Sequence, residues 1–207
     1  VGLAFDLAFK YRNPAIILAD GVIGQMMEKV VLPEQRPRLT NEEVMARCPW
    51  ATFGKLKHRG PNIVTSLELD PAEMEKRNIH LQQKYAEIEE KEVRYEEIHC
   101  DDAEYLIVAF GSCARIAQKA MEEARAEGIK VGLLRPITLW PFPSKAIAER
   151  SRQVKGILTV ELNAGQMVED VRLAVECKVP VEYFGRLGGI VPDPDEVVTA
   201  LKEKIIK

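Results

Sequence analysis

The chain has 207 residues, of which 46% are hydrophobic, and its formal net charge is −3. This composition supports a hydrophobic core, but the charge gives no general attraction to nucleic acids or acidic membrane surfaces. No apolar run is long enough to cross a bilayer, so we expect neither a nucleic-acid-binding nor a membrane protein. The four cysteines lie far apart without a CxxC pair, which matches neither an iron–sulfur nor a zinc pattern. Reduced thiols in a cytoplasmic protein are the expectation.

Residues 1–33 contain material for one helix and one strand. An amphipathic stretch precedes the apolar run Pro14–Ala19, which predicts a strand buried on both faces, and Asp20 and Gly21 follow it. One helix and one strand cannot cover both faces of such a strand. We therefore interpret residues 1–33 as the remnant of a domain whose larger part is absent. The alternative is a strand added to a sheet further along the chain.

Residues 34–99 predict a linker and a long helix. A capping box at Thr40–Glu43 marks a short helix. Asp70 followed by Pro71 predicts the start of a helix that runs to about Ile98. The linker also holds a basic group, interpreted as a solvated loop or as a phosphate or acidic-partner contact: Lys55, Lys57, His58 and Arg59.

Apolar residues repeat every seven positions along the long predicted helix. They are Met74, Leu81, Ile88 and Tyr95. A stripe this narrow is typical of a helix that bridges domains or lies on a partner. Self-association through a coiled coil is the alternative.

Residues 100–207 alternate short apolar runs with helical patterns. Tyr105–Phe110 predicts a strand, a helix follows and stops at Gly128, and Ile129–Leu134 predicts the next strand. This is a βαβ unit. Two more strands are predicted at Gly156–Glu161 and Val181–Phe184, each with helical sequence before it. The fold class is therefore α/β, with an open, mostly parallel sheet and helices on both faces.

Ligands of open α/β sheets gather beyond the carboxyl ends of the strands, which directs the search for a site. The turn at Gly111 and Ser112 presents backbone N–H groups where an anion could bind, but it is neither GxGxxG nor a Walker loop. Ser112 is predicted as a helix N-cap rather than a nucleophile, because GxSxG is absent. Glu161 and Asn163 could orient a substrate or a neighbouring subunit, with packing between domains as the alternative. The substrate or interface candidates are Gly111, Ser112, Arg135, Glu161, Asn163 and Gln166. No catalytic residue and no metal ligand is predicted.

Five segments of the chain together resemble the alpha subunit of the 2-oxoacid:ferredoxin oxidoreductases. They are NPAIILADGVIGQMMEKV (13–30), DPAEMEKRNIHLQQKYAEIEEKEVRYEE (70–97), GIKVGLLRPITLWPFP (128–143), ELNAGQMVEDVRLAVE (161–176) and YFGRLGGIVPDPDEV (183–197). They cover essentially the whole chain in order. The branched-chain members, which use 2-oxoisovalerate (3-methyl-2-oxobutanoate), resemble it most.

The resemblance implies a three-part organisation. Residues 1–33 would be the end of a pyrimidine-type thiamine-binding domain, 34–99 a linker and long helix, and 100–207 a transketolase-C-terminal-like domain. Four residues would then lie near the thiamine cofactor: Asp20, Gly21, Gly24 and Gln25. The family's catalytic residues would belong to the missing part.

The resemblance also implies a reaction and a set of partners. The reaction is oxidative decarboxylation of a branched-chain 2-oxoacid with coenzyme A, giving acyl-CoA, CO₂ and reduced ferredoxin. Thiamine diphosphate, Mg²⁺ and a [4Fe–4S] cluster would be held by a beta subunit, with a ferredoxin-like subunit passing electrons to ferredoxin. This chain would dock subunits and be inactive alone. The alternatives are a 2-oxoglutarate or pyruvate member of the family, a nucleotide- or CoA-binding module without catalysis, or a purely structural oligomerisation domain.

Overall fold

The computed structural model describes residues 1–51, 54, 57 and 60–206. Three members of the basic group, Lys55, His58 and Arg59, lie outside the described residues. The chain divides into two compact units. One consists of Val1–Met26 and Leu81–Lys207, and the other of Met27–His80.

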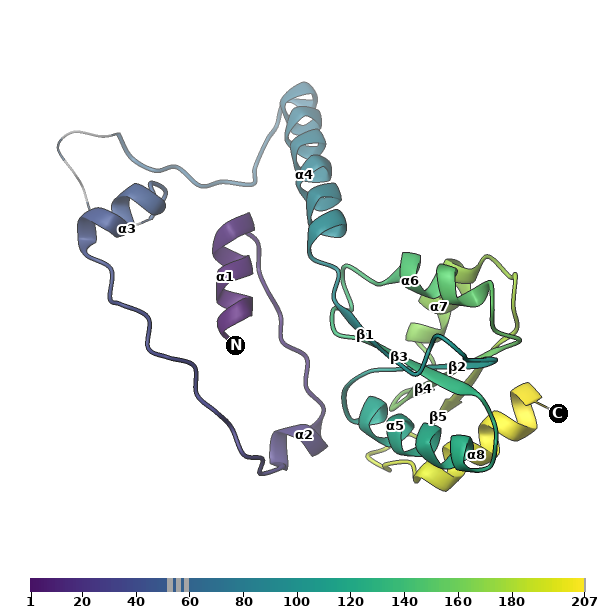
Figure 1. Ribbon diagram of the computed structural model, residues 1–207. Helices are drawn as coiled ribbons and strands as arrows, with labels where there is room; N and C mark the ends of the chain where they lie inside the picture. The colour runs from purple at the N-terminus through teal and green to yellow at the C-terminus, as the bar shows by residue number, and fades with distance from the viewer. Residues whose placement is uncertain (52–53, 55–56, 58–59, 207) are drawn as a thin grey trace. The chain divides into compact units, whose positions relative to one another are not determined.

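The larger unit contains a five-stranded sheet in the order β1-β3-β2-β4-β5 (Figure 1). Its strands are β1 Tyr95–Ile98, β2 Tyr105–Ala109, β3 Val131–Pro136, β4 Ile157–Glu161 and β5 Val181–Gly185. Strands β2 to β5 are parallel, while β1 runs antiparallel to β3 at one edge. The predicted open, mostly parallel α/β fold is confirmed.

Helices cover both faces of this sheet, as Figure 1 shows. They are α5 Gly111–Ala126, α6 Ser144–Ser151, α7 Met167–Val175 and α8 Pro194–Leu201, the last continuing as the π-helical turn η1 Lys202–Ile206. On one face, Ile107 and Leu158 of the sheet pack with α5 and α8. On the other face, Leu106 and Ile157 pack with α6 and α7. Because successive strand residues point to opposite faces, the continuous apolar runs seen in the sequence follow from this double burial.

The long helix is shorter than predicted. Helix α4 spans Pro71–Lys91, begins with Asp70 accepting a hydrogen bond from the Ala72 N–H at 2.8 Å, and ends seven residues before Ile98. Residues 95–98 instead form β1, because they pair with β3. The pairing begins at Arg94, whose N–H donates to Thr138 Oγ1 and whose C=O accepts from the Ile137 N–H. Tyr95 therefore does not continue the seven-residue stripe.

The described segments before α4 contain three short helices. They are α1 Gly2–Tyr11, α2 Gly21–Gln25 and α3 Asn41–Arg47. The predicted capping box at Thr40–Glu43 is present at the start of α3. Among the described residues, no helix is both long enough and apolar enough to span a membrane.

The predicted strand at Pro14–Ala19 is wrong for this chain. These residues are unpaired, and Ile16 and Leu18 are 80% and 72% exposed. The alternative, addition of this strand to the downstream sheet, is also not realised, since the sheet is built from β1 to β5. The local apolar pattern is that of a strand, but no other described segment supplies the hydrogen-bonding neighbour that a strand requires.

Candidate functional site

The start of α5 is the first place where the predicted site residues meet. Gly111 has φ +58° and is the first residue of the helix, with Phe110 as its N-cap. Ser112 is buried inside the first turn, so its predicted role as the N-cap is wrong. Its hydroxyl forms no hydrogen bond of standard geometry in the described part of the chain.

Asp20 lies against this helix start. One of its carboxylate oxygens, Oδ1, accepts a hydrogen bond from the Ile23 N–H at 2.8 Å and so caps α2. The other, Oδ2, lies 3.6 Å from the point that a Cβ on Gly111 would occupy. Burial opposes ionisation of Asp20, but the Ile23 N–H and the Ser112 hydroxyl and N–H that face it outweigh burial, and its pKa is lowered. A carboxylate is the favoured occupant of a helix N-terminus because of the helix dipole.

The side chain of Glu161, the last residue of β4, is hydrogen-bonded to the start of α7. Its carboxylate is buried and accepts three backbone hydrogen bonds, from Gln166 at 3.1 Å, Met167 at 2.9 Å and Val168 at 3.0 Å. It therefore satisfies N–H groups that a helix leaves without intrahelical partners. This geometry assigns Glu161 a structural contact within the chain.

The loop between Glu161 and α7 is held by further internal contacts. Asn163 Oδ1 accepts a hydrogen bond from the Gly165 N–H at 2.7 Å. The Asn163 carbonyl accepts one from the Tyr183 hydroxyl of β5. Gln166 is exposed as the residue before α7. Of these residues, Gln166 has the side chain that is available at the surface.

Arg135 lies in β3, which is separated from β4 and Glu161 by the central strand β2. It pairs across the strands with Glu96 of β1, with 2.9 Å between Arg135 Nη1 and Glu96 Oε2. Both side chains are about half exposed. The structure thus places Arg135 in a cross-strand ion pair rather than beside Glu161.

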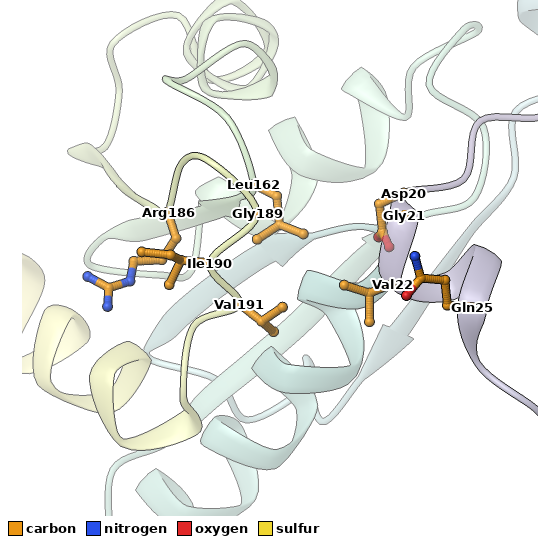
Figure 2. A pocket seen from close by; sticks show the side chains of 9 residues that line it. All are labelled: Asp20, Gly21, Val22, Gln25, Leu162, Arg186, Gly189, Ile190 and Val191. Carbon is orange, nitrogen blue, oxygen red and sulfur yellow. The ribbon is translucent and has the colours of Figure 1, made fainter.

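A pocket of about 370 Å³ opens where α2 approaches the loops that follow β4 and β5 (Figure 2). Asp20 and Gln25 lie at one side of it, and Arg186 lies at the opposite side. The lining residues are Asp20, Gly21, Val22, Gln25, Leu162, Arg186, Gly189, Ile190 and Val191. Three of the four residues predicted near the cofactor are among them, and Gly24 is not.

Leu162 and the loop at 186–191 were not among the candidate residues, although the strand ends at 161–166 and 185–189 are places where a ligand of an α/β sheet is expected. The Arg186 guanidinium pairs with Glu196 of α8 at 3.1 Å, and the Arg186 backbone N–H donates to the Glu161 carbonyl at 3.2 Å. Gly188 and Gly189 have φ of +66° and +86°. The sequence signal for this loop was the glycine pair shortly after the end of β5, since only glycine adopts such φ values freely.

The described residues do not fit a metal or a cluster. They contain no group of three or more His, Cys, Asp or Glu side chains placed to hold a metal ion. Cys100 and Cys113 belong to the cores on opposite faces of the sheet. Burial, followed by nearby negative charge, raises the pKa of Cys100 to about 11 and of Cys113 to about 12, which disfavours the thiolate that binds iron or zinc.

Comparisons with known proteins show which proteins this chain is similar to. Residues 103–197 match the family described as pyruvate:ferredoxin oxidoreductase core domain II. The chain is 47% identical to ketoisovalerate oxidoreductase subunit VorB of Methanothermobacter thermautotrophicus, over 97% of this chain and 55% of that protein. It is 31% identical to 2-oxoglutarate synthase subunit KorA of Archaeoglobus fulgidus, over 92% of this chain and 53% of that protein.

A solved structure is also similar. It is that of 2-oxoglutarate:ferredoxin oxidoreductase from Magnetococcus marinus with 2-oxoglutarate, coenzyme A and succinyl-CoA bound. The TM-score is 0.58 at 25% sequence identity, covering 66% of this chain and 24% of that chain. The chain thus spans about half the length of the curated relatives that it matches.

The parallel sheet and the match to core domain II define an α/β domain of the transketolase C-terminal-like class. The chain belongs to the 2-oxoacid:ferredoxin oxidoreductase family, and the resemblance found in its sequence is confirmed. Among the two relatives above, it is more similar to the ketoisovalerate subunit than to the 2-oxoglutarate subunit.

Proposed function

We propose that this chain is part of the alpha subunit of a branched-chain 2-oxoacid:ferredoxin oxidoreductase. The enzyme would convert 3-methyl-2-oxobutanoate and coenzyme A to the acyl-CoA and CO₂, passing two electrons to ferredoxin. The observation that carries this proposal is the 47% identity to a ketoisovalerate oxidoreductase subunit across 97% of the chain. The lower identity to the 2-oxoglutarate relative favours a branched-chain acid over 2-oxoglutarate.

Within that enzyme, we assign the chain a supporting role. Two carboxylates at helix starts, Asp20 and Glu161, are engaged by backbone N–H groups of this chain, so neither is offered as a free acid or base. Thiamine diphosphate, Mg²⁺ and the [4Fe–4S] cluster would be held mainly by a beta subunit. When bound, thiamine diphosphate supplies the carbanion-stabilising chemistry of decarboxylation, and protein residues supply position and electrostatics.

The proposed organisation keeps the three parts predicted from the sequence. Residues 1–33 would complete a thiamine-binding domain, 34–99 would link it, and 100–207 would form the core domain II, with the correction that β1 (Tyr95–Ile98) belongs to the sheet of the last domain. The exposed apolar run at 16–18 supports the first assignment, because such a run is normally covered by protein. Under this proposal, Asp20, Gly21 and Gln25 face the rest of the enzyme across the pocket.

The test uses the complete enzyme, purified with its partner subunits. Ferredoxin reduction is measured with coenzyme A and, in turn, 3-methyl-2-oxobutanoate, 2-oxoglutarate and pyruvate. We expect the highest kcat/KM for the branched-chain acid. A higher value for 2-oxoglutarate or pyruvate would assign the chain to the corresponding alternative, and the absence of coenzyme-A-dependent turnover with all three acids would refute the proposal.

A further inference from the structure

Helices α2 and α5 are in contact although they lie about ninety residues apart in the sequence. Besides Asp20 Oδ2, the Cδ1 atom of Ile23 lies 3.9 Å from the point that a Cβ on Gly111 would occupy. A charged and an apolar atom of the α2 segment thus both lie in van der Waals range of the first turn of α5. The carboxylate lies at the positive end of the α5 dipole, which favours its ionised form.

The same helical turn of α5 contains a buried thiol. Cys113 is in the first turn of α5 and is only 3% exposed. Burial raises its pKa to about 12, and the negative charges of Asp20 and Glu161 add to the effect. The Asp20 carboxylate is thus close enough to influence Cys113 electrostatically.

We propose that Asp20 is a positioning residue whose carboxylate holds residues 14–26 against the first turn of α5. This contact forms the α2 side of the pocket, and it shields Cys113 from solvent. Asp20 makes two contacts at once, as the cap of α2 and as the negative group at the start of α5. Four pocket residues, Asp20, Gly21, Val22 and Gln25, come from this segment. Release of Asp20 would therefore remove one side of the pocket and uncover Cys113. The inference concerns this chain's own contacts and does not depend on the proposed reaction.

The test compares Asp20→Ala and Asp20→Asn with the unchanged chain. Iodoacetamide labelling of each cysteine is followed by peptide mass spectrometry, together with amide hydrogen exchange of residues 14–26. Loss of a helix cap typically shifts a local equilibrium by about fivefold, so we expect Asp20→Ala to label Cys113 about fivefold faster. Asp20→Asn keeps an acceptor for the Ile23 N–H but loses the charge, so its rate should lie between the other two.

Cys100 is the internal control, because it is also 3% exposed but belongs to the core on the opposite face of the sheet. Its labelling rate should stay unchanged, as should the Cys113 rate in Glu122→Gln, which removes an exposed carboxylate from the same helix. Equal acceleration of Cys100 and Cys113 would show general unfolding and overturn the proposal. So would an Asp20→Asn variant that labels and exchanges like the unchanged chain, because the charge would then have no fastening role.

Discussion

At the scale of single residues, two buried carboxylates, Glu161 and Glu92, hold elements of this chain together through hydrogen bonds. Glu161 is 1% exposed, a position that a carboxylate normally occupies only when it is fully hydrogen-bonded. Its three N–H donors are those of the N-cap residue Gln166 and of the first two residues of α7, Met167 and Val168. One side chain thereby fixes the end of β4, the following loop and the start of a helix.

Replacement of Glu161 by Gln should destabilise the fold strongly. The amide has one acceptor oxygen in place of two and brings an NH₂ group toward backbone donors. We expect a loss of about 2–3 kcal/mol in the free energy of unfolding, measured by urea denaturation. Glu169→Gln, an exposed change in the same turn, is the control and should cost less than about 0.5 kcal/mol.

Glu92 is a second buried carboxylate, and it connects α1 to the end of α4. It accepts hydrogen bonds from Lys10 and Tyr11, both at 2.7 Å, and from Arg94 at 3.0 Å. These donors lower the pKa of Glu92 to about 2, with the Lys10 contact as the largest cause. The same contact raises the pKa of Lys10.

The Glu92 contacts predict a stability that depends on pH. A carboxyl whose pKa is lower in the folded state than in the unfolded state stabilises the fold above its unfolded pKa and stops doing so below its folded pKa. Stability should therefore fall as the pH drops from about 5 to about 2, by on the order of 2 kcal/mol. Urea unfolding across this range should show a smaller decrease in Glu92→Gln, whereas Glu90→Gln should follow the unchanged chain. Equal pH dependence in all three would contradict the assignment.

At the scale of elements, one glycine determines how the turn before β2 packs on the sheet. A Cβ on Gly132 of β3 would lie 2.9 Å from the His99 carbonyl, 3.0 Å from Cys100 Cα and 3.1 Å from Ala103 Cβ. These neighbours are mainly backbone atoms, which cannot rotate away. The turn between β1 and β2 can therefore lie directly on β3 only because residue 132 has no side chain.

Gly132→Ala should separate this turn from β3. We expect a loss of about 1–3 kcal/mol in thermal unfolding, as for other overpacked sites. Gly128→Ala provides a contrast, since residue 128 has φ +87° and no neighbour within 4 Å of its Cβ position. Its cost is conformational and should be about 1 kcal/mol. Amide exchange of β1 should increase in the Gly132 variant alone.

At the scale of the whole molecule, apolar residues are buried in the sheet but exposed in the segment at 16–18. Ile107 in β2 is fully buried, whereas Ile16, Ile17 and Leu18 are 80%, 59% and 72% exposed. An exposed run of this kind makes no contribution to this chain's own core.

The double change Ile16→Ser and Leu18→Ser should leave the free energy of unfolding within about 0.5 kcal/mol, because both side chains are already exposed. It should reduce binding of a hydrophobic dye and self-association, measured by fluorescence and sedimentation. In the complete enzyme, under the proposed organisation, it should weaken assembly. Ile107→Ser is the opposite control and should destabilise the chain by several kcal/mol, about the scale of other large core losses.

The sequence by itself determined the elements whose signals are local. The apolar runs of β2 to β5, the caps at Asp70 and Thr40 and the parallel α/β class all follow from residue patterns within a few positions. The family was also readable, since its motifs are short and lie in order along the chain.

Only the tertiary structure decided the features that depend on distant neighbours. β1 exists because β3 pairs with it, and the apolar run at 14–19 remains unpaired because no described strand does. Asp20 and Glu161 were recognised as polar groups at strand ends, but their engagement with α5 and α7 depends on where those helices begin in space. The physical reason is that a hydrogen-bond partner far along the chain leaves no trace in the local pattern of residues.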